Sequence, residues 1–147
     1  LERLLSHFEY VGVLAVEFFV VDGRLIANEI APRVHNSGHW TIDGAATSQF
    51  ENHMRAVCGL PLGSTDTHAE ALMVNWIGTM PAAPPFLRIP GLHWHSYDKQ
   101  PRPGRKLGHA TIAAADAPRL AARTRELRVL LGDSATGAIL DRLHADG

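Results

Sequence analysis

The sequence predicts an α+β fold of antiparallel strands and a few helices, and three observations carry this prediction. Residues 11–31 contain two runs rich in Val, Ile and Phe that flank Asp22 and Gly23, a typical hairpin turn. Ser48 stands three residues before a glutamate at the start of a helical pattern, which predicts a capping box. Asp116 opens a second helical pattern with leucines on one side.

The first half of the chain is expected to contain a helix end, a hairpin, a loop and a second helix. Residues 1–10 have apolar side chains at helical spacing and no initiator Met, so the chain resembles an excerpt from a longer protein. Both hairpin arms, 11–21 and 25–30, are apolar at nearly every position, which is typical of a sheet covered on both faces. Residues 32–43 are expected to form a loop, and Gly59 is expected to end the second helix.

The second half is expected to form a small domain after a linker at residues 60–68, which is rich in Pro, Gly, Ser and Thr. Its strands are expected at 69–77, 92–96 and 106–114, with a proline-rich loop at 81–90. The last helix is expected to end at Gly132. The sequence therefore predicts two domains, residues 1–62 and 66–147.

Composition and charge exclude several functions. The 147 residues carry 14 basic and 15 acidic side chains, and this net charge of -1 provides no field that would attract nucleic acid or an anionic membrane. No apolar run approaches the roughly 20 residues of a membrane helix. The single Cys58 excludes a disulfide framework and a multi-cysteine zinc site, and it fits a reducing compartment. Nine histidines indicate a polar site.

Two carboxylates interrupt the apolar hairpin. Glu17 and Glu29 on neighbouring strands would provide hard oxygen ligands suited to Mg²⁺ if they shared a face. A two-residue turn at Asp22 and Gly23 would place Glu17 opposite Asn28 and turn Glu29 away, so the metal hypothesis predicts a three-residue loop with Gly23 as a bulge residue. The alternative is that each glutamate lies near a strand end and faces water.

A dense polar loop follows the hairpin: Arg33, His35, Asn36, Ser37, His39 and Trp40. Arg33 suits a phosphate or carboxylate, His35 suits proton transfer, and the next amide and hydroxyl could position a polar substrate. The alternative is a polar turn that caps the next helix. A zinc site from His35 and His39 is disfavoured, because Pro32 and Gly38 oppose the helix that would align them.

A second cluster is basic and rich in Pro and Gly. Its polar members are Tyr97, Lys99, Arg102, Arg105, Lys106 and His109. Such a rigid loop of cations suits one phosphate group. A solvated surface is the alternative, and the balanced net charge weighs against an RNA-binding role.

The residues of both clusters resemble one enzyme family. Residues 29–40, Glu-Ile-Ala-Pro-Arg-Val-His-Asn-Ser-Gly-His-Trp, and residues 48–51, Ser-Gln-Phe-Glu, resemble 5-(carboxyamino)imidazole ribonucleotide synthase, an ATP-grasp enzyme of purine biosynthesis. Residues 97–99 and 102–109 resemble its C-terminal domain. The resemblance implies the C-terminal part of an ATP-grasp fold, an antiparallel sheet with a packed helix, followed by a small β-rich sandwich-hybrid domain.

The resemblance also implies cofactors and residue roles. ATP and Mg²⁺, or Mn²⁺, would be bound at Glu17 and Glu29, with Asn28 as a further contact, because Ala31 stands where many ATP-grasp enzymes have an asparagine. Catalysis would fall to three residues of the polar loop: Arg33, His35 and Asn36. Substrate binding would fall to Ser37, His39, Tyr97, Lys99, Arg102, Arg105 and Lys106.

The implied partners are bicarbonate and 5-aminoimidazole ribonucleotide, in a cytoplasmic homodimer that binds neither nucleic acid nor a membrane. The family's N-terminal domain and ATP-grasp lid have no counterpart in these residues, so the chain is expected not to turn over ATP alone. The alternatives are a non-catalytic phosphoribonucleotide-binding module and a dimerisation module. Formate-dependent glycinamide ribonucleotide transformylase, a related enzyme, is disfavoured by the His-Asn-Ser-Gly-His-Trp run.

Overall fold

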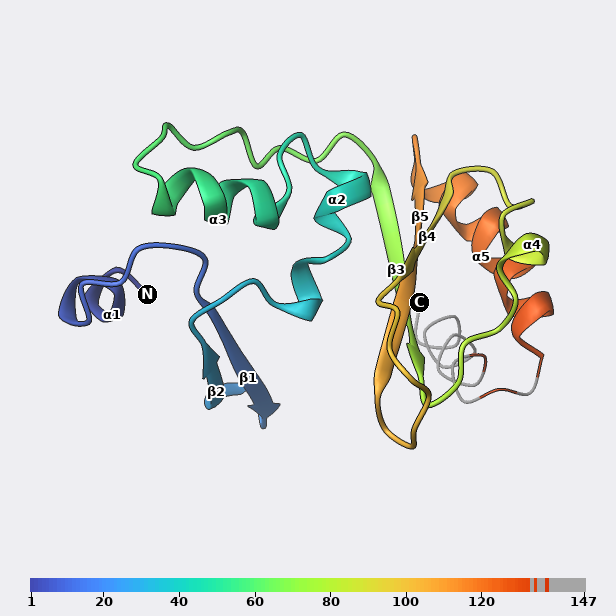
Figure 1. Cartoon of the computed structure of the whole chain (residues 1–147), viewed down its shortest axis with the longest axis horizontal. Coiled ribbons are helices and arrows are strands. Elements are labelled where there is room, and N and C mark those ends of the chain that lie inside the picture. The colour runs from blue at the N-terminus through green and yellow to red at the C-terminus, as the bar shows by residue number, and fades with distance from the viewer. Residues whose placement is uncertain (133, 135–136, 138–147) are drawn as a thin grey trace. The chain divides into compact units, whose positions relative to one another are not determined.

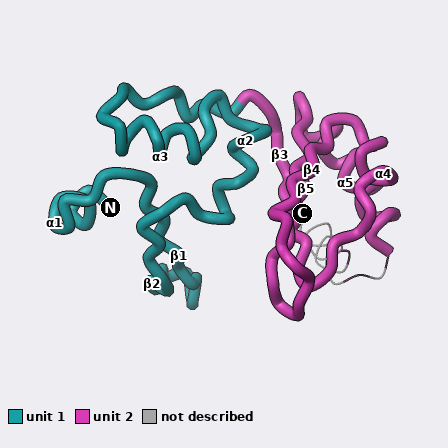
Figure 2. The backbone as a smooth tube through the Cα atoms, in the orientation of Figure 1, with its two compact units in different colours: residues 1–67 teal, residues 68–147 magenta. Residues whose placement is uncertain are grey.

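The computed structural model describes residues 1–132, 134 and 137, which form two compact units, residues 1–67 and the described residues from 68 onward (Figure 2). The first unit contains α1 (Glu2–His7), β1 (Ala15–Val21), β2 (Arg24–Ala31), the 3₁₀ helix η1 (Asn36–Gly38), α2 (Thr41–Gly44) and α3 (Gln49–Val57). The second contains β3 (Glu70–Ile77), α4 (Ala83–Phe86), β4 (Leu92–Ser96), β5 (Lys106–Ala114) and α5 (Ala117–Leu131) (Figure 1). The predicted α+β class is confirmed. None of the described helices has the length and hydropathy of a membrane-spanning segment.

The hairpin of β1 and β2 closes with a two-residue turn. Val21 pairs directly with Arg24, and the two residues between them, Asp22 and Gly23, have φ values of 51° and 72°. Two consecutive positive φ values are the requirement of a type I′ turn, whose twist matches that of the strands, and Asp and Gly adopt them at low cost. The predicted three-residue loop is therefore wrong.

A β-bulge nevertheless brings the two carboxylates together. Phe18 pairs with Ala27, but the next pair is Glu17 with Glu29, so Asn28 is an extra residue in β2. One extra residue changes the parity of the strand, because side chains alternate between faces with a period of two. The bulge thus has the effect that the sequence analysis expected of a longer turn.

The outer half of the hairpin exposes its apolar side chains. Phe19, Val20, Leu25 and Ile26 are all exposed in the described part of the chain, whereas the sequence predicted a sheet covered on both faces. Strands that are apolar on both faces are ordinarily buried between layers. The composition of this hairpin is therefore typical of a buried element, but its apolar side chains are exposed in this structure.

The segment 32–43 is more ordered than the expected loop, because it forms η1 and α2. His35 caps η1 with its side chain, which accepts a hydrogen bond from the backbone N–H of Ser37. Helix α3 begins after Ser48, as predicted, and the Ser48 hydroxyl accepts from the Glu51 N–H at 3.1 Å. The Glu51 carboxylate pairs with Arg55 rather than with the cap, so only half of the capping box forms.

In the second unit, β5 is the central strand of an antiparallel sheet with the order β3-β5-β4, and α5 covers one face (Figure 1). The predicted limits of β4 and β5 are confirmed, whereas α4 interrupts the predicted loop at 81–90 because proline suits the first turn of a helix. The core under α5 consists of Val74, Trp76, Phe86, Ile89, Leu92, Ala110, Ile112 and Leu127. The opposite face of β5 carries polar side chains at its centre.

The N-cap of α5 provides a test of this unit. The Asp116 carboxylate accepts from the Arg119 N–H at 2.9 Å, as the sequence predicts. We expect Asp116→Ala to lower the free energy of unfolding by about 1 kcal/mol, because an N–H of the first turn loses its acceptor. Thermal denaturation followed by circular dichroism measures the loss. Asp116→Asn keeps an acceptor and should retain most of the stability; an equal loss in both variants would contradict a capping role.

Candidate functional site

The candidate site of the first unit is built from two carboxylates and one imidazole. Glu17 on β1 faces Glu29 on β2, and the Nε2 atom of His35 lies 3.0 Å from Glu17 Oε1 and 3.9 Å from Glu29 Oε1. One ligand atom from each residue lies within 4.8 Å of the other two. The side chains of Glu17 and Glu29 are 44 % and 56 % exposed, whereas that of His35 is 12 % exposed. The carboxylates are therefore open to a ligand beside a shielded imidazole.

The His35 ring is oriented by its own loop. Its Nδ1 atom accepts from the Ser37 N–H at 3.3 Å and lies 2.9 Å from the Ser37 hydroxyl oxygen. A nitrogen that accepts from a fixed N–H carries no proton, so the neutral ring has its proton on Nε2. The Nε2–H group then donates to the Glu17 carboxylate. The loop thus presents a hydrogen-bond donor to the acidic pair.

The other predicted residues of this loop differ in their surroundings. Arg33 is exposed, and its guanidinium donates to the Val34 carbonyl at 3.0 Å rather than to a carboxylate. Asn36 begins η1. His39 lies at the other end of η1, with its ring 5.0 Å from that of Phe50. His35 thus brings this loop into contact with the acidic pair, and the Arg33 side chain is exposed to solvent.

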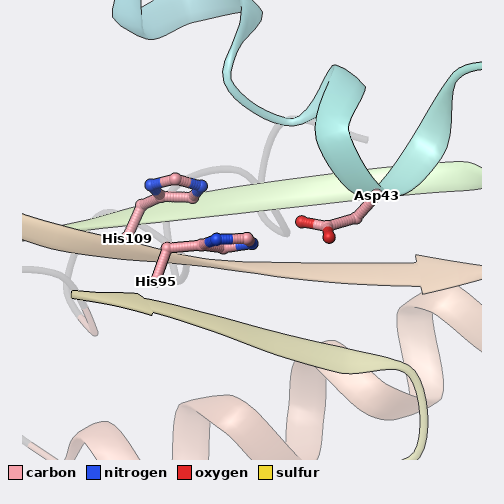
Figure 3. Close-up of side chains that lie close together, drawn as sticks. All are labelled: Asp43, His95 and His109. Atoms are coloured by element: carbon pink, nitrogen blue, oxygen red, sulfur yellow. The ribbon is translucent and has the colours of Figure 1, made fainter. Parts of the chain in front are cut away.

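The second predicted cluster begins on the segment after β4 and continues into β5. The Tyr97 hydroxyl lies 2.7 Å from His109 Nδ1, and the Lys99 ammonium lies 5.1 Å from the centre of the Tyr97 ring. That distance is typical of a cation–π contact. The His109 ring in turn stacks on that of His95 at 4.3 Å, and the close-up shows the two rings one above the other (Figure 3). The aromatic ring of Tyr97 thus contacts one cation of the cluster, Lys99.

The remaining cations follow along the same segment. Arg102 and Lys106 are exposed, and the Arg105 guanidinium is 3.5 Å from the Gln100 carbonyl. Backbone bonds hold the turn, because the Arg102 carbonyl accepts from the Arg105 N–H at 3.1 Å and the Arg105 carbonyl accepts from the Gly78 N–H at 2.8 Å. The predicted residues therefore form two clusters, one in each unit. Backbone hydrogen bonds hold the loop that carries the cations of the second cluster.

One residue that the sequence analysis did not select is central to the first cluster. Gln49, the first residue of α3, forms three side-chain hydrogen bonds to the polar loop: with the N–H and carbonyl of His35 and with the ring of His39. Its position directly after the N-cap was the available signal, because a side chain there points back along the preceding loop. A long amide at that position can reach loop groups that a capping serine cannot.

Comparison with known proteins defines the class to which this geometry belongs. Residues 1–50 match the family model of the ATP-grasp domain, and residues 71–123 match that of the phosphoribosylaminoimidazole carboxylase C-terminal domain. The acidic pair and the polar loop lie in the first match, and the cationic loop lies in the second. The chain thus combines a segment of an ATP-grasp domain with the C-terminal domain of a carboxylase.

The most similar relatives share one enzyme name. An N5-carboxyaminoimidazole ribonucleotide synthase from Pseudomonas aeruginosa is 57 % identical over 129 residues, which cover 88 % of this chain and 36 % of the relative. The crystal structure of the synthetase from Thermus thermophilus superimposes with a TM-score of 0.82 at 51 % identity, covering 90 % of this chain and 37 % of that one. The chain is similar to the C-terminal part of these proteins, and it spans about a third of the length of the relatives it matches.

A second similar structure contains ligands. It is the synthase from Aspergillus clavatus in complex with ADP and 5-aminoimidazole ribonucleotide, and it superimposes with a TM-score of 0.70 at 36 % identity. The match covers 80 % of this chain and 35 % of that one. That protein therefore holds a nucleotide and a ribonucleotide in the same complex.

Proposed function

We propose that the chain supplies the metal-binding wall and the ribonucleotide-phosphate loop of an N5-carboxyaminoimidazole ribonucleotide synthase. In this proposal ATP phosphorylates bicarbonate to carboxyphosphate, and the exocyclic amine of 5-aminoimidazole ribonucleotide is then carboxylated with release of phosphate. Residues 1–62 would form the C-terminal part of the ATP-grasp domain, and residues 66–147 would form the small C-terminal domain. The observation that carries the proposal is the opposition of Glu17 and Glu29 beside His35.

The acidic pair fits a divalent cation. Its oxygens are hard donors, they face each other across the hairpin, and both side chains are open to solvent, so that a cation could keep positions for phosphate oxygens. When bound, Mg²⁺ or Mn²⁺ would neutralise the charge that develops on the transferred phosphoryl group. The Nε2–H group of His35 would hold Glu17 in place, and Asn28 at the bulge would offer an amide beside the pair.

The polar loop would act on the reacting groups. Arg33, exposed and four residues after Glu29 in the sequence, would bind bicarbonate or the carboxylate of the carboxylated intermediate, because its guanidinium forms paired hydrogen bonds. His35 would transfer a proton, and Asn36 would orient the intermediate. Ser37 and His39 would contact the substrate from the same loop. Electrostatic stabilisation of the developing charge is the main contribution expected from this arrangement.

The loop between β4 and β5 would bind the 5′-phosphate of the ribonucleotide. Its cations, of which Lys99 lies over the ring of Tyr97, suit one compact anion. The residues proposed for this contact are Tyr97, Lys99, Arg102, Arg105 and Lys106. We further propose that the complete enzyme is a cytoplasmic homodimer.

We expect the 147-residue chain alone to show no ATP turnover with bicarbonate and 5-aminoimidazole ribonucleotide. The chain spans about a third of its relatives' length, and its hairpin leaves Phe19 and Leu25 exposed where a further layer would pack. A chimera should restore turnover, with the preceding two thirds supplied by the Pseudomonas aeruginosa relative. A coupled ADP-release assay measures both proteins. Turnover by the isolated chain, or none by a folded chimera, would contradict the proposal.

The chimera also distinguishes the enzyme hypothesis from the hypothesis of a non-catalytic binding module. For the enzyme, Glu29→Gln should abolish turnover while ribonucleotide binding survives, and Arg105→Ala should weaken ribonucleotide binding. For a non-catalytic phosphoribonucleotide-binding module, only Arg105→Ala would have an effect. Isothermal titration with 5-aminoimidazole ribonucleotide measures the binding half of this comparison.

A further inference from the structure

The amide of Gln49 forms a pair of hydrogen bonds with the backbone of the site's histidine. Its Oε1 atom accepts from the His35 N–H at 3.0 Å, and its Nε2 atom donates to the His35 carbonyl at 2.7 Å. A primary amide can satisfy both groups in one orientation only, because the flipped amide would direct oxygen at oxygen and nitrogen at nitrogen. The backbone of His35 therefore determines which way the amide of Gln49 points.

The same orientation determines the protonation pattern of a second histidine. The second hydrogen on Gln49 Nε2 points to His39 Nδ1, at 2.7 Å. Since this amide nitrogen is only a donor, Nδ1 of His39 must be an acceptor and the neutral ring carries its proton on Nε2. One side chain thus connects the backbone at one end of η1 with the ring tautomer at the other.

Thr41 closes a ring of hydrogen bonds around the loop. Its hydroxyl donates to the Gly38 carbonyl at 2.6 Å and accepts from the Gln49 backbone N–H at 3.0 Å. Gly38 packs against the amide itself, because a Cβ atom there would lie 2.7 Å from Gln49 Oε1. The φ value of Gly38 is not positive, so close approach rather than backbone conformation requires the glycine.

We propose that Gln49 is a positioning residue of the candidate site, holding His35 beside the carboxylates through its backbone and selecting the tautomer of His39. Gln49 contacts neither carboxylate, so it acts through the loop. The assignment of this site to metal and substrate binding rests on the proposed function, but the contacts of Gln49 can be tested without measuring turnover. Groups that orient the ligands of a metal typically change its affinity by 10- to 100-fold when they are removed.

The same helix provides a matched control. Asn52 also forms an amide pair with the backbone of one residue, since its Oδ1 atom accepts from the Gly63 N–H at 2.8 Å and its Nδ2 atom donates to the Gly63 carbonyl at 3.3 Å. Both side chains are half-buried on α3. Asn52→Ala therefore removes a similar pair of amide–backbone hydrogen bonds, but from the linker and not from the loop of the site.

The test uses the 147-residue chain with ¹⁵N-labelled histidine, at about pH 8, where ordinary histidines are neutral. We expect Gln49→Ala to remove the fixed Nε2–H tautomer of His39, to shift the backbone amide signal of His35 and to weaken Mn²⁺ binding about tenfold. Gly38→Ala should produce the same changes from the loop side. Gln49→Glu, which keeps an acceptor for His35 but loses both donors, should place a proton on His39 Nδ1.

Asn52→Ala should leave the His35 and His39 signals and the Mn²⁺ affinity unchanged. The proposal is overturned if Gln49→Ala leaves the tautomer of His39 as it was, or if Asn52→Ala moves the same signals equally. Failure of the proposed function has a different signature: Mn²⁺ would then not broaden the His35 signals of the unaltered chain. The tautomer result would still decide the role of Gln49 in that case.

Discussion

Replacing Glu29 with Gln should lower the Mn²⁺ affinity of the chain by about tenfold or more, and Glu17→Gln combined with Glu29→Gln should abolish measurable binding. Each change keeps the size of the side chain and removes one anionic ligand from a pair that the hairpin holds together. The amide oxygens that remain are weak ligands for a hard cation. Water-proton relaxation during a Mn²⁺ titration measures the affinity directly.

Stability should change little in the same variants. Both carboxylates are about half exposed, and ion pairs at such positions contribute about 0–1 kcal/mol. Glu70→Gln, at the exposed start of β3, is the control for loss of one negative charge, and it should bind Mn²⁺ as the unaltered chain does. Undiminished Mn²⁺ binding in the double variant would place the cation elsewhere and contradict the acidic pair as its site.

Replacing Leu127 with Ala should destabilise the second unit by about 2–5 kcal/mol, the largest stability effect expected in this chain. Leu127 is 0 % exposed and lies in the core that α5 forms with the sheet. Truncation removes its transfer free energy and leaves a cavity that the sheet cannot fill. Urea unfolding in a Trp40→Phe background measures the loss, because Trp76 and Trp94 then remain as reporters within the second unit.

Val129 on the same helix provides the comparison. Its side chain is 78 % exposed, so Val129→Ala should change the free energy of unfolding by less than about 0.5 kcal/mol. Leu127→Met keeps most of the volume and should cost less than about 1.5 kcal/mol. Equal unfolding midpoints for Leu127→Ala and Val129→Ala would show that the core does not depend on α5.

Local signals in the sequence predicted the elements well. The caps at Ser48 and Asp116 start α3 and α5 as expected, and β4 and β5 have their predicted limits. Caps and strand composition act within a few residues, so they can be recognised without the fold. The helical turns η1 and α2 were missed, since a hydrogen bond from the distant Gln49 supports that segment in addition to local bonds.

The candidate site was predicted in composition but not in geometry. The sequence indicates Glu17 and Glu29 because a carboxylate in apolar surroundings costs free energy unless it is paired or binds a cation. The sequence predicts that a three-residue loop brings them to one face, whereas the structure has a two-residue turn and a bulge at Asn28. Turn and bulge have the same effect on strand parity, and the sequence does not distinguish them because Asp-Gly suits either.

The sequence by itself determined the resemblance to one enzyme family, the residue types of both clusters and the limits of most elements, because these depend on residue identity and on short-range hydrogen bonds. Only the tertiary structure decided that Glu17 faces Glu29, that the Nε2–H group of His35 points to them, and that Gln49 holds that histidine. Strand register and an amide contact between residues 14 positions apart depend on which distant groups meet. A shift of one residue along β2 would turn Glu29 to the other face while changing no residue of the sequence.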